Sequence, residues 1–259
     1  MLGAIVGDII GSPYEGKRSR IKEIEFALFS GESVFTDDTV CTVAVADWIL
    51  NGGSLAELFH EYVDRYPHAG YGQSFFDWCF RREREPYNSW GNGSAMRVSP
   101  AGWARETLKE TLALAKRSAA VTHNHPDGVL GAQAVAGCIF NARRGGTTEE
   151  IREFVDAWIG YDLRSTLDEI RPDYRFDVSC AGSVPESIIA FLESTDFESA
   201  VRNAVSLGGD SDTMAAIAGS IAEAFYGGVP QPLVEEAMSR LDDDLADVVT
   251  TFRERFVPG

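Results

Sequence analysis

Residues 207–227 read LGGDSDTMAAIAGSIAEAFYG, a polar turn followed by a long apolar run. Apolar residues recur three and four positions apart in this run, which predicts a helix over residues 213–226, just before a glycine. Residues 215–224 are rich in Ala and Gly, and so are residues 128–137. Because small side chains let helix backbones approach closely, we expect both segments in a tightly packed helical core.

Helix signals recur along the rest of the chain. Residues 36–50 carry apolar side chains at helical spacing and stop at two glycines, and similar runs cover residues 128–143 and 185–193 and begin again at Leu233 and Leu245. Capping-box patterns at other helix starts are Ser54 with Glu57, Thr107 with Glu110, Thr147 with Glu150, and Thr195 with Glu198. Strand-like alternation is almost absent and no linker divides the chain. The sequence therefore predicts an all-α protein, one compact domain over residues 1–259.

Composition and charge narrow the possible partners. The 259 residues include 23 basic and 40 acidic side chains, a formal net charge of −17, which argues against nucleic acid or an anionic membrane. The four cysteines form no CxxC pair, so neither a zinc site nor a disulfide framework is indicated. The apolar N-terminus lacks a basic segment and contains Asp8, and no run approaches the length of a membrane span. We expect a soluble, cytoplasmic protein.

Two of the predicted helix starts are crowded with oxygen atoms. Thr36-Asp-Asp-Thr39 opens one helix, and Asp210-Ser-Asp-Thr213 opens the helix over residues 213–226. For one such cluster alone, helix capping is the first interpretation, because these side chains accept backbone N–H bonds and acids suit the helix dipole. The alternative is a cation site, since oxygen ligands without His or Cys suit Mg²⁺, Mn²⁺ or Ca²⁺. If the two starts met in space, they could hold two ions about 3.5 to 4 Å apart.

Three further segments could complete such a site. Glu15 lies in the turn-rich segment GSPYEG, from which a loop could bring its carboxylate over the ions, although an isolated Glu is usually a surface residue. Residues 88–97, NSWGNGSAMR, offer backbone N–H groups to an anion and Trp90 as a stacking face, or simply form a turn. In residues 122–127, THNHPD, we favour contact of His123 with a sugar or phosphate over metal binding.

The order of these motifs resembles the ADP-ribosylglycohydrolase family. GAIVGDIIGSPYEG, FTDDTV, GNGSAMRVSP, THNHPDG and LGGDSDTMAAIAGSIAEAFYG follow one another between residue 3 and about residue 227. A single motif such as TDDT is weak, whereas five in the right order at compatible spacing are specific. The resemblance implies an orthogonal all-α domain with two Mg²⁺ or Mn²⁺ ions at the base of a cleft. It also implies cleavage of the bond between ADP-ribose and a protein side chain or small molecule.

The resemblance assigns roles to individual residues. One ion would be held by Thr36, Asp37, Asp38 and Asp212. The other would be held by Asp210, Asp212 and Thr213, with Asp212 shared. Glu15 matches a flap glutamate near the scissile bond, and the substrate would be contacted by Gly72, Ser89, Trp90, Asn92, Gly93, Ser94, Ala95, Met96 and His123.

The chemistry can also be argued from the residue types. Two hard cations can bind vicinal ribose hydroxyls and orient a water, and cleavage at an anomeric carbon needs a carboxylate as acid or base. Glu15 is the first candidate for that role, and Asp37 or Asp38 the second. The alternatives are a metal-dependent phosphohydrolase and a non-catalytic member that binds ADP-ribose or has a structural task. The sequence leaves the acceptor and the oligomeric state open.

Overall fold

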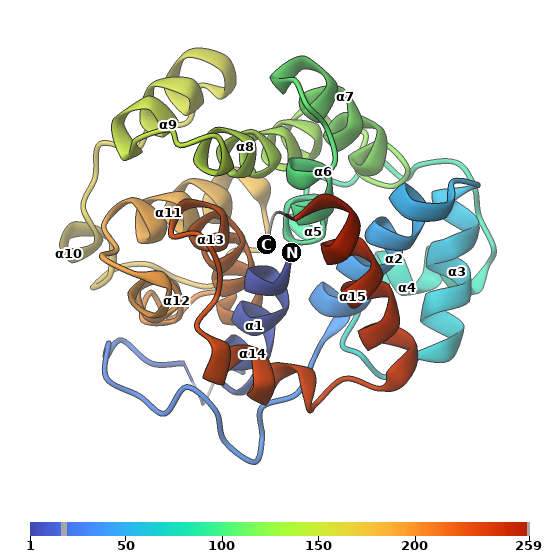
Figure 1. Cartoon of the computed structure of the whole chain (residues 1–259), viewed down its shortest axis with the longest axis horizontal. Helices are drawn as coiled ribbons and strands as arrows, with labels where there is room; N and C mark the ends of the chain where they lie inside the picture. Colours follow the sequence, from blue (N-terminus) through green and yellow to red (C-terminus); the bar gives the residue numbers. More distant parts are fainter. Residues whose placement is uncertain (17–19, 258–259) are drawn as a thin grey trace.

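The computed structural model describes residues 1–16 and 20–257, and within these ranges it contains helices and loops but no β-strand (Figure 1). The all-α prediction is confirmed. The helices are α1 (Leu2–Gly11), α2 (Asp37–Asn51), α3 (Leu55–Arg65), α4 (Gln73–Phe80), α5 (Gly93–Met96), α6 (Ser99–Trp103), α7 (Leu108–Ala119), α8 (Pro126–Arg143), α9 (Thr148–Phe154), α10 (Leu167–Ile170), α11 (Cys180–Leu192), α12 (Phe197–Val205), α13 (Ser211–Phe225), α14 (Gln231–Met238) and α15 (Asp243–Phe256). A 3₁₀ turn, η1 (Ser12–Tyr14), follows α1, and a π-helical turn, η2 (Val155–Ile159), follows α9.

Helices α1 and α13 lie near the centre of the molecule, and the other helices surround them (Figure 1). All of α1 and nearly all of α13 are buried. Gly3, Gly7 and Gly11 recur every fourth residue along the face of α1 that meets α13. A Cβ atom built on Gly7 would lie 2.1 Å from the carbonyl oxygen of Ala215, and one on Gly3 would lie 2.1 Å from that of Gly219. The two backbones are therefore in direct contact, as the small residues of 215–224 predict.

Helix α8 shows the same use of small residues in the other predicted segment. A Cβ built on Gly131 would lie 2.4 Å from Sγ of Cys180, and one on Gly137 would lie 2.2 Å from the ring of Phe154. The absence of side chains at these two positions lets α8 receive Cys180 of α11 and Phe154 of α9. Substituting either glycine would push these helices apart.

Several helix starts differ from the sequence prediction. Helix α11 begins at Cys180 rather than at Pro185, because the Ser179 hydroxyl accepts a bond from the backbone N–H of Gly182 at 2.9 Å and caps an earlier turn. Pro185 therefore lies inside the helix. Helix α8 begins two residues before the predicted Gly128, where the His125 side chain is the cap.

One predicted capping box is wrong by one residue. The expected pair of Thr195 and Glu198 does not cap α12. Instead, Asp196 accepts from the backbone N–H of Ser199 at 2.7 Å, and Ser199 accepts from that of Asp196 at 3.0 Å. Aspartate is as good a cap as threonine, so the sequence offers two competing registers. The pair of Thr147 and Glu150 forms the complete box, and the N-caps Ser54 and Thr107 also accept from the residue three positions on.

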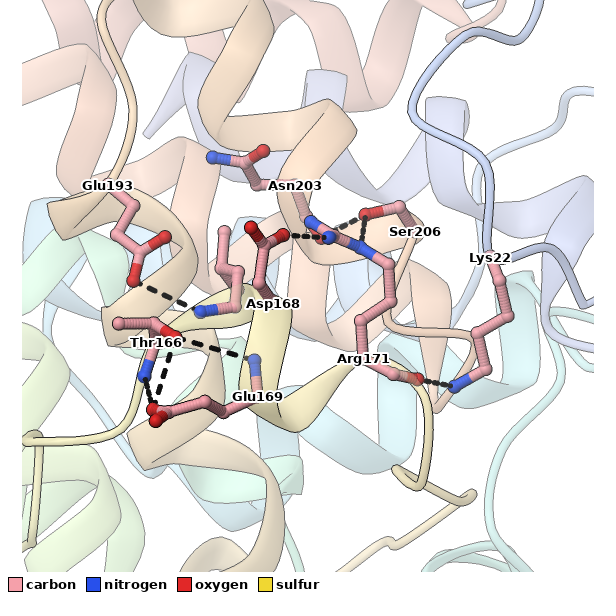
Figure 2. Close-up of polar contacts among 9 residues, drawn as sticks. Lys22, Thr166, Asp168, Glu169, Arg171, Glu193, Asn203 and Ser206 are labelled. Atoms are coloured by element: carbon pink, nitrogen blue, oxygen red, sulfur yellow. Dashed lines mark hydrogen bonds and ion pairs between the residues drawn. The ribbon is translucent and has the colours of Figure 1, made fainter.

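Lys22 ties the segment after η1 to the turn before α13. Its ammonium group donates to the backbone carbonyls of Arg171 at 2.7 Å, Tyr174 at 3.0 Å and Leu207 at 2.5 Å. Figure 2 shows Lys22 at the Arg171 carbonyl, and it shows the Arg171 guanidinium bonded to α10 and to the end of α12. Leu207 lies three residues before Asp210, so this cation fixes the turn from which the acidic residues of α13 begin.

None of the helices in the described ranges combines the length and the apolar character needed to cross a membrane. Cys41, Cys79, Cys138 and Cys180 are buried free thiols, in agreement with the absence of a disulfide framework in the sequence prediction.

Candidate metal centre and ligand cavity

Asp8 of α1 organises the start of α2. Its carboxylate accepts four hydrogen bonds: from the backbone N–H of Thr36 at 3.0 Å, the Thr36 hydroxyl at 2.7 Å, the backbone N–H of Thr39 at 3.1 Å and the Thr39 hydroxyl. Asp8 is fully buried, and this burial raises its pKa to about 6, although the four hydrogen bonds act in the opposite direction. The Thr36 hydroxyl also accepts from the backbone N–H of Asp38 at 3.2 Å and caps the helix. Asp37 and Asp38 are thereby left without a capping task.

The acidic residues that begin α13 are likewise free of capping. Asp210 occupies the N-cap position, but its side chain makes no capping bond and instead accepts from Nδ2 of Asn92 at 2.8 Å. The Ser211 hydroxyl donates to the backbone carbonyls of Tyr14 and Gly209, so it does not cap the helix either. Asp212 accepts one local bond from the backbone N–H of the next residue at 3.0 Å. Capping accounts for Thr36 and leaves the aspartates unexplained.

The two helix starts meet in space. The Thr213 hydroxyl donates to Oδ2 of Asp38 at 3.1 Å, although 175 residues separate them in the chain. The other oxygen of Asp38, Oδ1, is buried and has no hydrogen-bond partner among the described residues. A buried carboxylate oxygen without a partner is costly, and a bound cation would satisfy it.

Glu15 joins the same cluster from the segment after η1. Carboxylate oxygens of Glu15, Asp210 and Asp212 lie within 4.8 Å of one another, a separation that a metal ion could bridge. The Arg20 side chain donates to the backbone carbonyl of Glu15 at 3.2 Å, which helps to hold this segment against the cluster. The structure thus brings the segment of Glu15, the predicted acid–base residue, to the two segments that carry the predicted metal ligands.

The cluster has a strong excess of negative charge. Burial and the neighbouring carboxylates Asp8, Asp210 and Glu15 raise the pKa of Asp37 to about 8. The pKa values of Asp38 and Asp212 are raised well above their usual range, first by burial and then by nearby aspartates. In the described part of the chain, none of these carboxylates has an ion pair with Lys or Arg. The donors are all oxygen atoms, which is the chemistry of a site for hard divalent cations.

A cavity of about 470 Å³ opens onto this cluster. Besides the acids, its walls include the loop of residues 88–93, with Trp90 half exposed, and the residues Phe176 and Val178. These two walls are joined by backbone bonds, from the N–H of Asn92 to the carbonyl of Val178 at 2.8 Å and from that of Cys180 to the carbonyl of Trp90 at 3.0 Å. The cavity therefore combines a polar, acidic region with exposed apolar side chains.

Most residues predicted to contact substrate line this cavity: Gly72, Ser89, Trp90, Asn92, Gly93, Met96 and His123. Ser94 and Ala95 are fully buried and do not line it, and the Ser94 hydroxyl is bonded to the carbonyl of Gly128 at 2.6 Å. The short helix α5 turns these two side chains into the core, and the contact that the sequence predicts for this loop, through its backbone N–H groups, stays a prediction. Thr36 also lies outside the cavity lining, with its hydroxyl directed at Asp8.

Sequence reasoning missed several residues at the site, among them Asp8, Phe176 and Val178. Asp8 carried a signal, because a carboxylate in the apolar run GAIVGDIIG is an anomaly that burial makes expensive. Phe176 and Val178 carried none, since the residues between α10 and α11 have no pattern that points to a loop some 85 residues earlier. Their place depends on the pairing with residues 90–92, which is a tertiary contact.

Comparisons with known proteins agree with this geometry. The family model for ADP-ribosylglycohydrolase matches residues 1–257. The chain is 27% identical to ADP-ribosylhydrolase ARH3 of Xenopus tropicalis, over 90% of this chain and 87% of that protein. It is 25% identical to ADP-ribosylarginine hydrolase Tri1 of Pseudomonas putida (strain GB-1), over 91% of this chain and 72% of that protein.

A solved structure extends the comparison to the backbone. A chain of an ADP-ribosylglycohydrolase-related protein complex superposes with a TM-score of 0.71 and 24% identity, covering 98% of this chain and 96% of that one. At this identity the superposition establishes the fold. Because the family model spans nearly the whole sequence and the motif residues converge on one cavity, the chain belongs to the ADP-ribosylglycohydrolase family.

Proposed function

We propose that this protein is a hydrolase that uses two Mg²⁺ or Mn²⁺ ions to cleave the N- or O-glycosidic bond between ADP-ribose and an acceptor. The observation that supports this proposal most strongly is that Glu15, Asp210 and Asp212 meet at a cavity that Trp90 also lines. The relatives named as ADP-ribosylhydrolases support the reaction type. The acceptor is a protein side chain or a small molecule.

The residues fit a pair of divalent cations. Asp38 has a buried oxygen without a partner among the described residues, and burial followed by repulsion between the carboxylates raises the pKa values of Asp37 and Asp38. Thr36 and Thr213 each direct their hydroxyl proton at a carboxylate, which leaves an oxygen lone pair for an ion. The ligands of one ion would be Thr36, Asp37, Asp38 and Asp212, and those of the other Asp210, Asp212 and Thr213. Ions bound there would supply Lewis-acid contacts for ribose hydroxyls and would neutralise the carboxylates that hold them.

The chain itself supplies the acid–base group and the means of orientation. Partial burial, followed by the charges of Asp210 and Asp8, raises the pKa of Glu15, which favours the protonated carboxyl group that a proton donor needs. We assign to Glu15 the proton transfer at the leaving group. Asn92 holds Asp210 in place through its amide, and Trp90 offers a face for the adenine.

The test is an activity panel with matched variants. ADP-ribosylated arginine and serine peptides are incubated with the protein in Mg²⁺ or Mn²⁺, and free ADP-ribose is measured by chromatography. Wild type is expected to release ADP-ribose, and Asp212→Asn to lose both turnover and the rise in melting temperature that Mn²⁺ causes. Asp247→Asn, an exposed carboxylate on α15, should change neither.

Glu15→Gln separates catalysis from metal binding. It should keep the response to Mn²⁺ while kcat falls by about 10²–10⁴-fold, the usual contribution of an acid–base group. Release of inorganic phosphate instead of ADP-ribose would indicate a phosphohydrolase. Tight binding of ADP-ribose without turnover of any substrate would indicate a non-catalytic binding protein.

A further inference from the structure

Arg97 is a buried cation at the wall of the cavity. Its side chain is almost fully inaccessible, and its guanidinium lies over the ring of Phe59 at 4.5 Å. In the described ranges it has no ion pair, and its Nε has no hydrogen-bond partner. Its one side-chain hydrogen bond there goes from the terminal nitrogen Nη2 to the hydroxyl of Thr122 at 2.8 Å. A buried charge with so few partners needs a reason to be there.

The Thr122 hydroxyl continues the chain of hydrogen bonds. Thr122 is fully buried, and its Oγ1 lies 2.7 Å from Nδ1 of His123. An arginine guanidinium has only donors, so Thr122 must accept from Arg97. The hydroxyl has one proton, and Nδ1 of His123 is its one other partner among the described residues.

The direction of the second bond follows from the first. If Nδ1 carried a proton, both neighbours would donate to Thr122, and the buried hydroxyl proton would be left without an acceptor. If Thr122 donates to Nδ1, the hydroxyl proton has an acceptor and Nδ1 has a donor. A doubly protonated ring is disfavoured as well, because burial and the charge of Arg97 lower the pKa of His123 well below its usual range. The arrangement therefore selects one neutral tautomer.

The remaining ring nitrogen faces the ligand cavity. His123 lines the cavity, and its Nε2 would lie 3.2 Å from a Cβ built on Gly93 and 3.7 Å from one built on Gly91. No hydrogen bond to Nε2 occurs among the described residues. The glycines leave room beside this nitrogen for a ligand atom.

We propose that Arg97 and Thr122 are positioning residues that hold His123 as the neutral tautomer with its proton on Nε2. His123 then presents a permanent N–H donor to an oxygen atom of the ligand, a ribose hydroxyl or a phosphate oxygen, and does not act as a base. The identity of the ligand rests on the proposed function, whereas the tautomer does not.

The tautomer is measured directly by ¹⁵N NMR of the histidine rings, with His123→Gln used to assign the signals. In wild type near neutral pH, Nε2 of His123 should show the shift of a protonated nitrogen and Nδ1 that of an unprotonated one. Thr122→Ser keeps the hydroxyl and should keep this pattern. Thr122→Val removes the hydroxyl at similar volume and should give the other tautomer or a mixture. A wild-type ring protonated at Nδ1, or an unchanged pattern in Thr122→Val, overturns the proposal.

Binding of ADP-ribose, followed by calorimetry, gives a second measurement. Thr122→Val should weaken binding about tenfold, since a hydrogen bond to the ligand loses its fixed donor, while Thr122→Ser should stay near wild type. If wild type does not bind ADP-ribose at all, the proposed function fails, and the NMR spectrum still decides the tautomer. If Thr122→Val fails to fold, the wild-type spectrum and Thr122→Ser remain decisive.

Discussion

Replacing Gly7 with alanine tests the contact between α1 and α13. The added Cβ would lie 2.1 Å from the carbonyl oxygen of Ala215, whereas ordinary contact begins at 3.4 Å, so the helices must separate by about 1.3 Å. The obstructing atoms are backbone atoms of a buried helix, which cannot rotate away as a side chain can. Overpacking of this kind costs about 1–3 kcal/mol, and α1 has no exposed face that would relieve it. Alanine also has a higher helix propensity than glycine, which offsets this cost by about 1 kcal/mol. Because the obstructing atoms are backbone atoms, we take the upper end of the overpacking cost, about 3 kcal/mol, and expect a net loss of about 2 kcal/mol.

Urea unfolding and thermal melting measure this loss. About 2 kcal/mol corresponds to a fall in melting temperature of about 4–8 °C for a protein of this size. The matched control is Gly31→Ala, because Gly31 is exposed and a Cβ there meets nothing within 4 Å. The control should lie within about 0.5 kcal/mol of wild type. A Gly7→Ala protein as stable as the control would refute the backbone contact between the two helices.

Three other predictions concern the polar groups around the centre. Asp8→Asn replaces a carboxylate that accepts four hydrogen bonds by an amide with one acceptor oxygen. The free energy of unfolding, measured in urea, should therefore fall by about 2–3 kcal/mol. An unchanged urea midpoint of unfolding would contradict the role of Asp8. Lys22→Met keeps the alkyl stem but leaves three carbonyls without their donor, and should cost about 1–3 kcal/mol in the same assay, more than substitution of an exposed lysine such as Lys109. In metal-free protein, the folded Asp37 has a pKa of about 8 against an ordinary value of 3.8, so folding stabilises its protonated form. The free energy of unfolding relative to Asp37→Asn should therefore fall as pH rises from about 4 to about 8, while the stabilisation by Mn²⁺ should grow over the same range. If the difference in melting temperature between Mn²⁺ and EDTA stayed constant over this pH range, the result would contradict this prediction.

The helices were predictable because their signals are local. Apolar spacing and capping residues act within one or two turns, so the helices opened by Ser54, Thr107 and Thr147 begin where the sequence indicates. The errors arise where two local signals compete. At α11, Pro185 resembles a first-turn proline, but Ser179 caps the chain one turn earlier. At α12, Asp196 displaces the neighbouring threonine as the cap.

The site was predictable only in part. The two acidic helix starts are recognisable as unusual, and the structure joins them through Thr213 and Asp38. What the sequence did not show is which atoms are already engaged. Ser94 lies in the motif of residues 88–97, whose polar residues suggest a binding site. Its hydroxyl nevertheless donates to the carbonyl of Gly128, because α5 and α8 pack together. Such engagement depends on tertiary contacts that no single segment encodes.

Helix α1 serves as a common reference for the two halves of the metal centre. Its glycines fix it against α13, and its Asp8 fixes the first turn of α2. Loops inserted between α2 and α13 would leave the spacing of the two acidic turns unchanged, because α1 contacts each turn directly.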